Sequence, residues 1–200
     1  TLNMTTLKYF FDVRNTEENR KLFKDLYIEK SEYFKEQGQY PVIFITLKDF
    51  KKNTWEEMNF EIKELLRNLY DEFNFIRDTL SISDLREFDK IWLKEEDANY
   101  DSSLLNLTKY LYNYYKKEVV LLIDEYDSLL ITANQRGYYK DSINFFRNFL
   151  SLALKTNSYL KMGVLTGTVQ VAKEGIFSGL NNIITYNILG NDFETFFGLS

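Results

Sequence analysis

The amino-acid sequence predicts an α/β fold, a three-layer sandwich in which helices cover both faces of a mainly parallel sheet. Aliphatic runs at 42–47, 119–123 and 161–166 are continuous rather than alternating, as in strands that are buried on both faces. Longer segments with helical spacing of their apolar residues separate these runs, and this order favours parallel strands joined by helices. Of the 200 residues, 44% are hydrophobic, which is enough for a sizeable core.

Local patterns predict the individual elements in chain order. The segments with helical spacing of apolar residues are 2–13, 17–36, 55–78, 84–92, 102–116 and 138–155. The strand-forming runs are 42–47, 119–123, 161–166 and 183–188. Thr54 and Glu57 have the spacing of a capping box and mark the start of the third helix. We expect the strand at 119–124 to pair with at least one of its two neighbours.

No internal repeat, low-complexity tract or proline-rich linker divides the chain, so residues 1–200 are expected to form one domain. The chain starts at Thr1 rather than at methionine and stops abruptly at Ser200, which predicts a truncated domain within a longer protein. It has no secretory signal and no apolar stretch of about 20 residues. We therefore expect a cytoplasmic protein without a membrane-spanning helix.

The composition excludes several kinds of chemistry. Cysteine is absent, which rules out disulfides and thiolate metal sites, and histidine is absent, which rules out Ser-His-Asp triads and histidine-ligated zinc. The net charge of −5 provides no overall basic field, so we expect no direct nucleic-acid binding by this segment. Any reaction has to use carboxylates, hydroxyls, Lys, Arg, backbone amides or an oxygen-ligated ion.

An acidic pair, Asp124 and Glu125, directly follows the five aliphatic residues 119–123. In open α/β sheets, ligands bind beyond the carboxyl ends of the strands. Asp124 can hold Mg²⁺, and Glu125 can orient or deprotonate the water that attacks a γ-phosphate, as in the Walker B element of P-loop ATPases. The alternative is that Asp124 or Asp127 caps the following helix while Glu125 is solvated.

The third aliphatic run ends in Leu165-Thr166-Gly167-Thr168. In AAA-like P-loop ATPases, the strand beside Walker B ends in a polar residue next to the γ-phosphate and the attacking water. Thr166 occupies the corresponding place and is a candidate catalytic residue. The alternative is a Thr-Gly-Thr turn that simply leads out of a strand.

The sequence resembles the predicted AAA-ATPase-like family, which belongs to the P-loop NTPases. The resembling blocks are Leu121–Asp127, Leu165–Thr168, Val171–Asn182 and Phe196–Gly198. The Ile-Asp-Glu-Tyr-Asp and Phe-Ser-Gly-Leu-Asn-Asn strings within these blocks are specific to the family. The resemblance extends over essentially the whole chain, and longer members often carry a restriction-endonuclease-like domain.

The resemblance implies ATP and Mg²⁺ as cofactors, with Asp124 as a metal ligand and Glu125 as a catalytic residue. It also implies that Thr1 is the Walker A hydroxyl residue, which contacts both the nucleotide and the metal. The glycine-rich loop, its lysine and the first strand would then lie just before Thr1, and the helical lid beyond Ser200. We accordingly expect residues 1–200 alone to be inactive and to bind nucleotide only feebly.

Two further features have open interpretations. Lys173, Ser178, Asn181 and Asn182 form either a second sensor-like contact, a partner surface or a buried polar turn. Arg136 and Arg147 are either candidates for an arginine finger or part of a solvated helix face, and the solvated face is favoured.

Three functions compete on the sequence alone. The first is an ATPase module that drives or gates an attached effector, with a nuclease-like domain or self-association as partners. The second is an interaction domain that keeps the fold without turnover. The third is a carboxylate and Mg²⁺ nuclease, which the acidic charge and the lack of an Asp/Glu-x-Lys triplet on a neighbouring strand disfavour.

Overall fold

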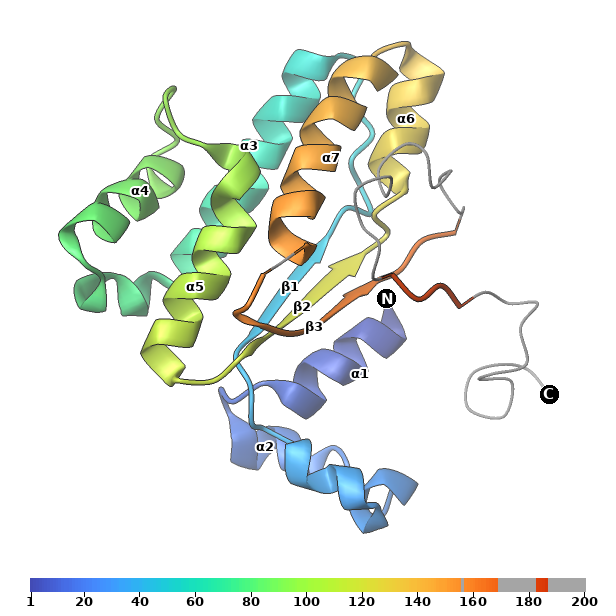
Figure 1. Cartoon of the computed structure of the whole chain (residues 1–200). Coiled ribbons are helices and arrows are strands. Elements are labelled where there is room, and N and C mark those ends of the chain that lie inside the picture. Colours follow the sequence, from blue (N-terminus) through green and yellow to red (C-terminus); the bar gives the residue numbers. More distant parts are fainter. Residues whose placement is uncertain (156, 169–182, 187–200) are drawn as a thin grey trace.

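The computed structural model describes residues 1–155, 157–168 and 183–186. A three-stranded parallel sheet occupies its centre (Figure 1). The strands are β1 (Val42–Thr46), β2 (Val119–Asp124) and β3 (Leu160–Leu165). They follow one another in the order β1-β2-β3, so β2 pairs with a strand on each side. The predicted parallel arrangement around the acidic pair's strand is confirmed.

Seven α-helices surround this sheet within the described residues. They are α1 (Leu2–Phe11), α2 (Thr16–Lys21), α3 (Trp55–Glu72), α4 (Ile82–Trp92), α5 (Ser103–Tyr115), α6 (Ser128–Arg136) and α7 (Tyr139–Leu154). Short 3-10 helices complete the fold: η1 (Tyr27–Lys30), η2 (Glu32–Glu36), η3 (Asn74–Thr79) and η4 (Tyr100–Ser102). The predicted capping box is present in part, because the Thr54 hydroxyl accepts from the Glu57 N–H at 3.2 Å.

The two faces of the sheet have separate cores of unequal size. Side chains alternate along β2, so Val119, Leu121 and Ile123 face one core, while Val120 and Leu122 face the other. The larger core includes side chains from α3, α4, α5, α6 and α7. The smaller core lies against α1, which runs along the opposite face (Figure 1). The expected three layers are therefore present, with one helical layer much thicker than the other.

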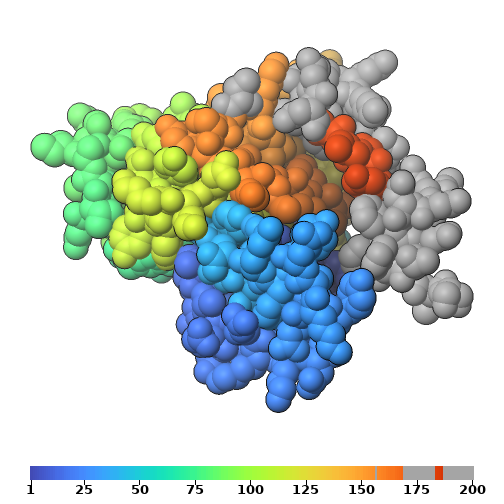
Figure 2. All heavy atoms as spheres, turned by 60° about the horizontal axis from the view of Figure 1, so that its bottom comes forward, coloured from blue at the N-terminus to red at the C-terminus, as the bar shows by residue number. Residues whose placement is uncertain are grey.

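The prediction of one long helix at 17–36 is wrong. The helix α2 ends at Lys21, and Asp25 has a left-handed backbone with φ of 63°. Leu22, Leu26 and Tyr27 are exposed, and of the apolar residues expected to face inward only Phe23 is buried, against Phe10. Burial supplies most helical stability in proteins, so a continuous helix is poorly supported here. Figure 2 shows this N-terminal segment, in blue, as a protrusion of its own.

Three other element predictions need correction. The helix expected over 55–78 ends at Glu72, and η3 follows it. The helix α6 was not expected, because its apolar face is short and a left-handed Gly137 ends it after nine residues. No strand forms at 183–186, where the side chains are exposed, and residues 187 and 188 lie outside the described residues. None of the described helices is long and apolar enough to cross a membrane.

The central strand should be the most sensitive part of the core. Leu121 is completely buried in the larger core. Its replacement by Ala should lower the free energy of unfolding by about 2–5 kcal/mol, because lost burial and a residual cavity add together. Urea denaturation followed by circular dichroism measures this loss.

The matched control is Ile82→Ala, since Ile82 is 91% exposed and should change stability by no more than about 0.5 kcal/mol. Equal effects of the two substitutions would contradict the assignment of β2 to the core.

Candidate functional site

Three residues that are far apart in the sequence meet at the carboxyl edge of the sheet: Thr1, Asp124 and Thr166. Asp124 is the last residue of β2. Thr166 directly follows β3, and its N–H donates to the Ile123 carbonyl at 3.0 Å. Thr1 stands at the start of α1, and the N-terminus lies beside the ends of the strands in Figure 1. Ligand sites of open α/β sheets lie at this edge.

Asp124 is almost completely buried, with 1% of its surface exposed. Its Oδ1 accepts a hydrogen bond from the Thr166 hydroxyl at 2.7 Å. The backbone nitrogen of Thr1 lies 3.4 Å from the same oxygen. The second oxygen, Oδ2, is buried and has no hydrogen-bond partner among the described residues. One carboxylate oxygen is thus held in place, and the other is buried without a hydrogen-bond donor among the described residues.

Burial and hydrogen bonding act on the pKa of Asp124 in opposite directions. Burial raises the pKa, whereas the hydrogen bond from the Thr166 hydroxyl lowers it. The pKa of Asp124 lies below the ordinary value for an aspartate. Asp124 is therefore a carboxylate at neutral pH, which is the form that binds a cation.

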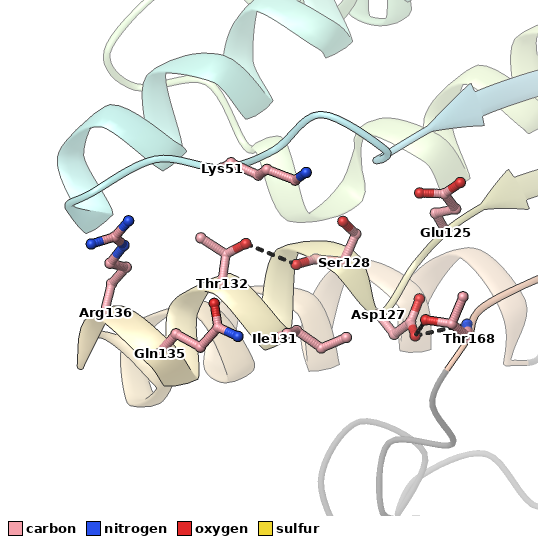
Figure 3. A pocket seen from close by; sticks show the side chains of 9 residues that line it. All are labelled: Lys51, Glu125, Asp127, Ser128, Ile131, Thr132, Gln135, Arg136 and Thr168. Carbon is pink, nitrogen blue, oxygen red and sulfur yellow. Dashed lines mark hydrogen bonds between the residues drawn. The ribbon is translucent and has the colours of Figure 1, made fainter.

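Glu125 is not part of the group that Thr1, Asp124 and Thr166 form. Its backbone is left-handed, with φ of 54°, which is uncommon for a residue with a side chain. Its partly buried carboxylate lines a cavity of about 400 Å³ between α6 and the loop after β1 (Figure 3). Lys51 and Arg136 line the same cavity. Arg136 is exposed at the end of α6, as expected for a solvated helix face.

Asp127 makes a contact that sequence reasoning missed. It stands at the N-cap position of α6, but its side chain makes no capping hydrogen bond there. Its Oδ2 instead accepts from the N–H and the hydroxyl of Thr168, at 2.8 Å and 3.0 Å. The alternative in which Asp127 caps the following helix is therefore wrong, and Asp124 is likewise bonded to Thr166 rather than to a helix amide.

Lys51 and Thr168 were also absent from the sequence prediction. Lys51 belongs to an irregular loop and follows no motif, so no sequence signal marked it. A sequence signal did exist for Thr168, because a buried aspartate such as Asp127 needs hydrogen-bond donors, and Thr168 offers an N–H and a hydroxyl. Lys173, Ser178, Asn181 and Asn182 lie outside the described residues.

Thr166 should control the ionisation of Asp124. In Thr166→Val the donor is lost and burial continues to disfavour the charged form, so the pKa of Asp124 should rise. NMR titration of the Asp124 carboxyl carbon measures this. The control is Thr132→Val, which removes a hydroxyl that donates to the Ser128 carbonyl and should leave the Asp124 titration unchanged.

The same substitution should alter acid stability. Because the folded pKa of Asp124 is lowered, this carboxylate stabilises the fold above the ordinary aspartate pKa, and the contribution is lost as pH falls through the folded pKa. Thr166→Val should therefore move acid unfolding to higher pH. An unchanged titration of Asp124 would show that Thr166 does not govern it.

Comparison with known proteins gives one match. The sequence model of the AAA-ATPase-like family, described as "Predicted AAA-ATPase", matches residues 1–177. No curated protein and no solved structure gives a significant match. The match includes Thr1, Asp124, Glu125 and Thr166. This chain belongs to the AAA-ATPase-like family.

Proposed function

We propose that this chain is part of a module that binds and hydrolyses ATP with Mg²⁺ in the full-length protein. The arrangement of Asp124 carries the proposal: Oδ1 is held by Thr166 and lies near the Thr1 nitrogen, while the buried Oδ2 has no partner among the described residues. A buried acceptor without a donor is costly unless a ligand completes it. Membership of a family described as ATPases supports a nucleotide as the source of that ligand.

The residues around Asp124 fit a magnesium ion. Mg²⁺ prefers oxygen ligands and commonly uses one or two carboxylates together with phosphates and water. The described residues contain no group of three or more His, Cys, Asp or Glu side chains that could hold an ion by themselves. We assign Asp124 and the Thr1 hydroxyl as the protein ligands. When bound, the ion would neutralise charge on the phosphates.

The start of α1 is the proposed place for the phosphates. Thr1 stands at the N-cap of this helix, and its side chain makes no capping hydrogen bond. Unpaired amides and the helix dipole give such an end a partial positive charge. Its position beside Asp124 supports a phosphate site next to the proposed metal ligand, at one edge of the sheet. Thr1 is therefore the proposed cofactor-binding residue.

We assign the catalytic roles to Glu125 and Thr166. Glu125 is the residue that orients or deprotonates the attacking water, and its cavity gives water access to the carboxylate. The proposal requires the Glu125 side chain to turn from this cavity toward the phosphates when nucleotide binds. Thr166 acts from the neighbouring strand, where its hydroxyl already orients Asp124.

We also propose that hydrolysis drives or gates an attached effector, either a nuclease-like domain or a second copy of the chain. The net charge of −5 supports an effector other than nucleic acid bound directly to this segment.

Glu125→Gln should separate hydrolysis from binding. In the full-length protein, Mg²⁺-dependent ATP hydrolysis should fall by about 10²–10⁴-fold, because the amide cannot accept the proton of the attacking water. ATP affinity should persist, since the phosphates and the ion contact other residues. Steady-state phosphate release and calorimetric titration with ATP and Mg²⁺ measure the two quantities.

The matched control is Glu118→Gln, an exposed glutamate just before β2 at the opposite end of the same strand. Its turnover should equal that of the unaltered protein. Unchanged turnover in Glu125→Gln would remove Glu125 from the mechanism, and a protein that binds no ATP would favour the interaction domain.

A further inference from the structure

Asp127 ties the turn after β3 to the loop after β2. Its carboxylate is buried, with 1% of the residue exposed. One of its oxygens accepts two hydrogen bonds from Thr168, one from the N–H and one from the hydroxyl. These bonds connect Asp127, in the loop after β2, with Thr168, which lies two residues beyond Thr166.

Two other contacts hold the same turn. The Tyr126 N–H donates to the Thr166 carbonyl at 3.0 Å. At Gly167 an added Cβ would lie 2.8 Å from Asp127 Oδ1 and 2.9 Å from the Tyr126 ring, so the backbone approaches more closely than a side chain would permit. The turn at 166–168 is therefore fixed by its backbone, by close packing and by the Asp127 carboxylate.

The position of Thr166 depends on such support. Thr166 lies just past the last paired residue, Leu165. The Thr166 hydroxyl meets the Asp124 carboxylate at 2.7 Å, and such a contact requires the Thr166 backbone to be placed to within about 0.5 Å.

We propose that Asp127 is a positioning residue for the ATPase site, which holds the 166–168 turn so that the Thr166 hydroxyl faces Asp124. This inference rests on the proposed function for its catalytic consequence. Its structural part is independent, because the link from Asp127 through Thr168 to Thr166 concerns this chain's own residues. Asp127 acts on the reaction through Thr166 and touches no substrate.

The test uses the full-length protein with Asp127→Ala and, as a milder change, Thr168→Val, which removes the hydroxyl donor and keeps the N–H. In Asp127→Ala, kcat should fall by roughly 10–100-fold, as for other residues that orient a site from behind. The affinity for ATP and Mg²⁺ should remain within about threefold of the original, since the phosphate and metal ligands are unchanged. The conservative variant Thr168→Ser keeps both donors, so its kcat should equal that of the unaltered protein.

Two readouts distinguish positioning from a merely structural role. In Asp127→Ala the pKa of Asp124 should rise, as in Thr166→Val, because the Thr166 hydroxyl is no longer held on it. The double variant Asp127→Ala with Thr166→Val should have the same kcat as Thr166→Val alone, because both substitutions remove the same hydrogen bond from Thr166 to Asp124. The control Asp89→Ala removes a carboxylate that accepts two hydrogen bonds from Arg77, and it should change neither kcat nor the Asp124 titration.

The proposal would be overturned if the falls in kcat of the two single variants multiplied in the double variant. It would also be overturned if the Asp124 titration were unchanged in a folded Asp127→Ala protein. Should Asp127→Ala fail to fold, Thr168→Val decides by the same readouts, with a smaller fall in kcat expected. Should the unaltered protein hydrolyse no ATP, the proposed function fails, and the Asp124 titration alone decides whether Asp127 positions Thr166.

Discussion

Asp124 is a charged side chain at the end of a strand that is buried along its whole length. Taking a carboxylate out of water is expensive unless hydrogen bonds and opposite charge replace its hydration. The Thr166 hydroxyl provides part of this replacement at Oδ1, but the described residues provide none at Oδ2. The architecture around the sheet edge follows from this requirement, because two distant segments have to reach one carboxylate.

The unequal helical layers explain how the segments that contain Thr1 and Thr166 come to lie beside Asp124. The helices from α3 to α7 fill one face of the sheet, whereas α1 packs against the other face through residues such as Met4. Packing along this face fixes α1 against β2 and leaves Thr1 at the carboxyl edge. The pairing of β3 with β2 brings Thr166 to the same edge from the other side. Hydrophobic packing thus determines where the polar residues meet.

Adjacent acidic residues have different environments here because of one backbone torsion. The left-handed φ of Glu125 turns the chain between Asp124, which is buried and hydrogen-bonded, and the partly exposed Glu125 carboxylate beside its cavity. Such a backbone is unfavourable for a residue with a side chain and persists where the surroundings enforce it. The ties from Asp127 and Tyr126 to the turn after β3 are the surroundings that do so. These two environments agree with the roles proposed for Asp124 in metal binding and for Glu125 in water activation.

The sequence by itself determined the parallel strands and the Asp124–Glu125 pair, because continuous aliphatic runs and the residues that end them are local patterns. Thr166 was found in the same way. Only the tertiary structure decided that the Asp127 carboxylate accepts from Thr168 rather than capping α6. Either set of hydrogen bonds would satisfy a buried carboxylate, and the folded chain brings the Thr168 donors within reach. The tertiary structure also decided that residues 22–36 leave the helical path. Their apolar spacing is helical, but Leu22, Leu26 and Tyr27 remain exposed, whereas Phe23 and Phe34 pack against Phe10 of α1 from an irregular path.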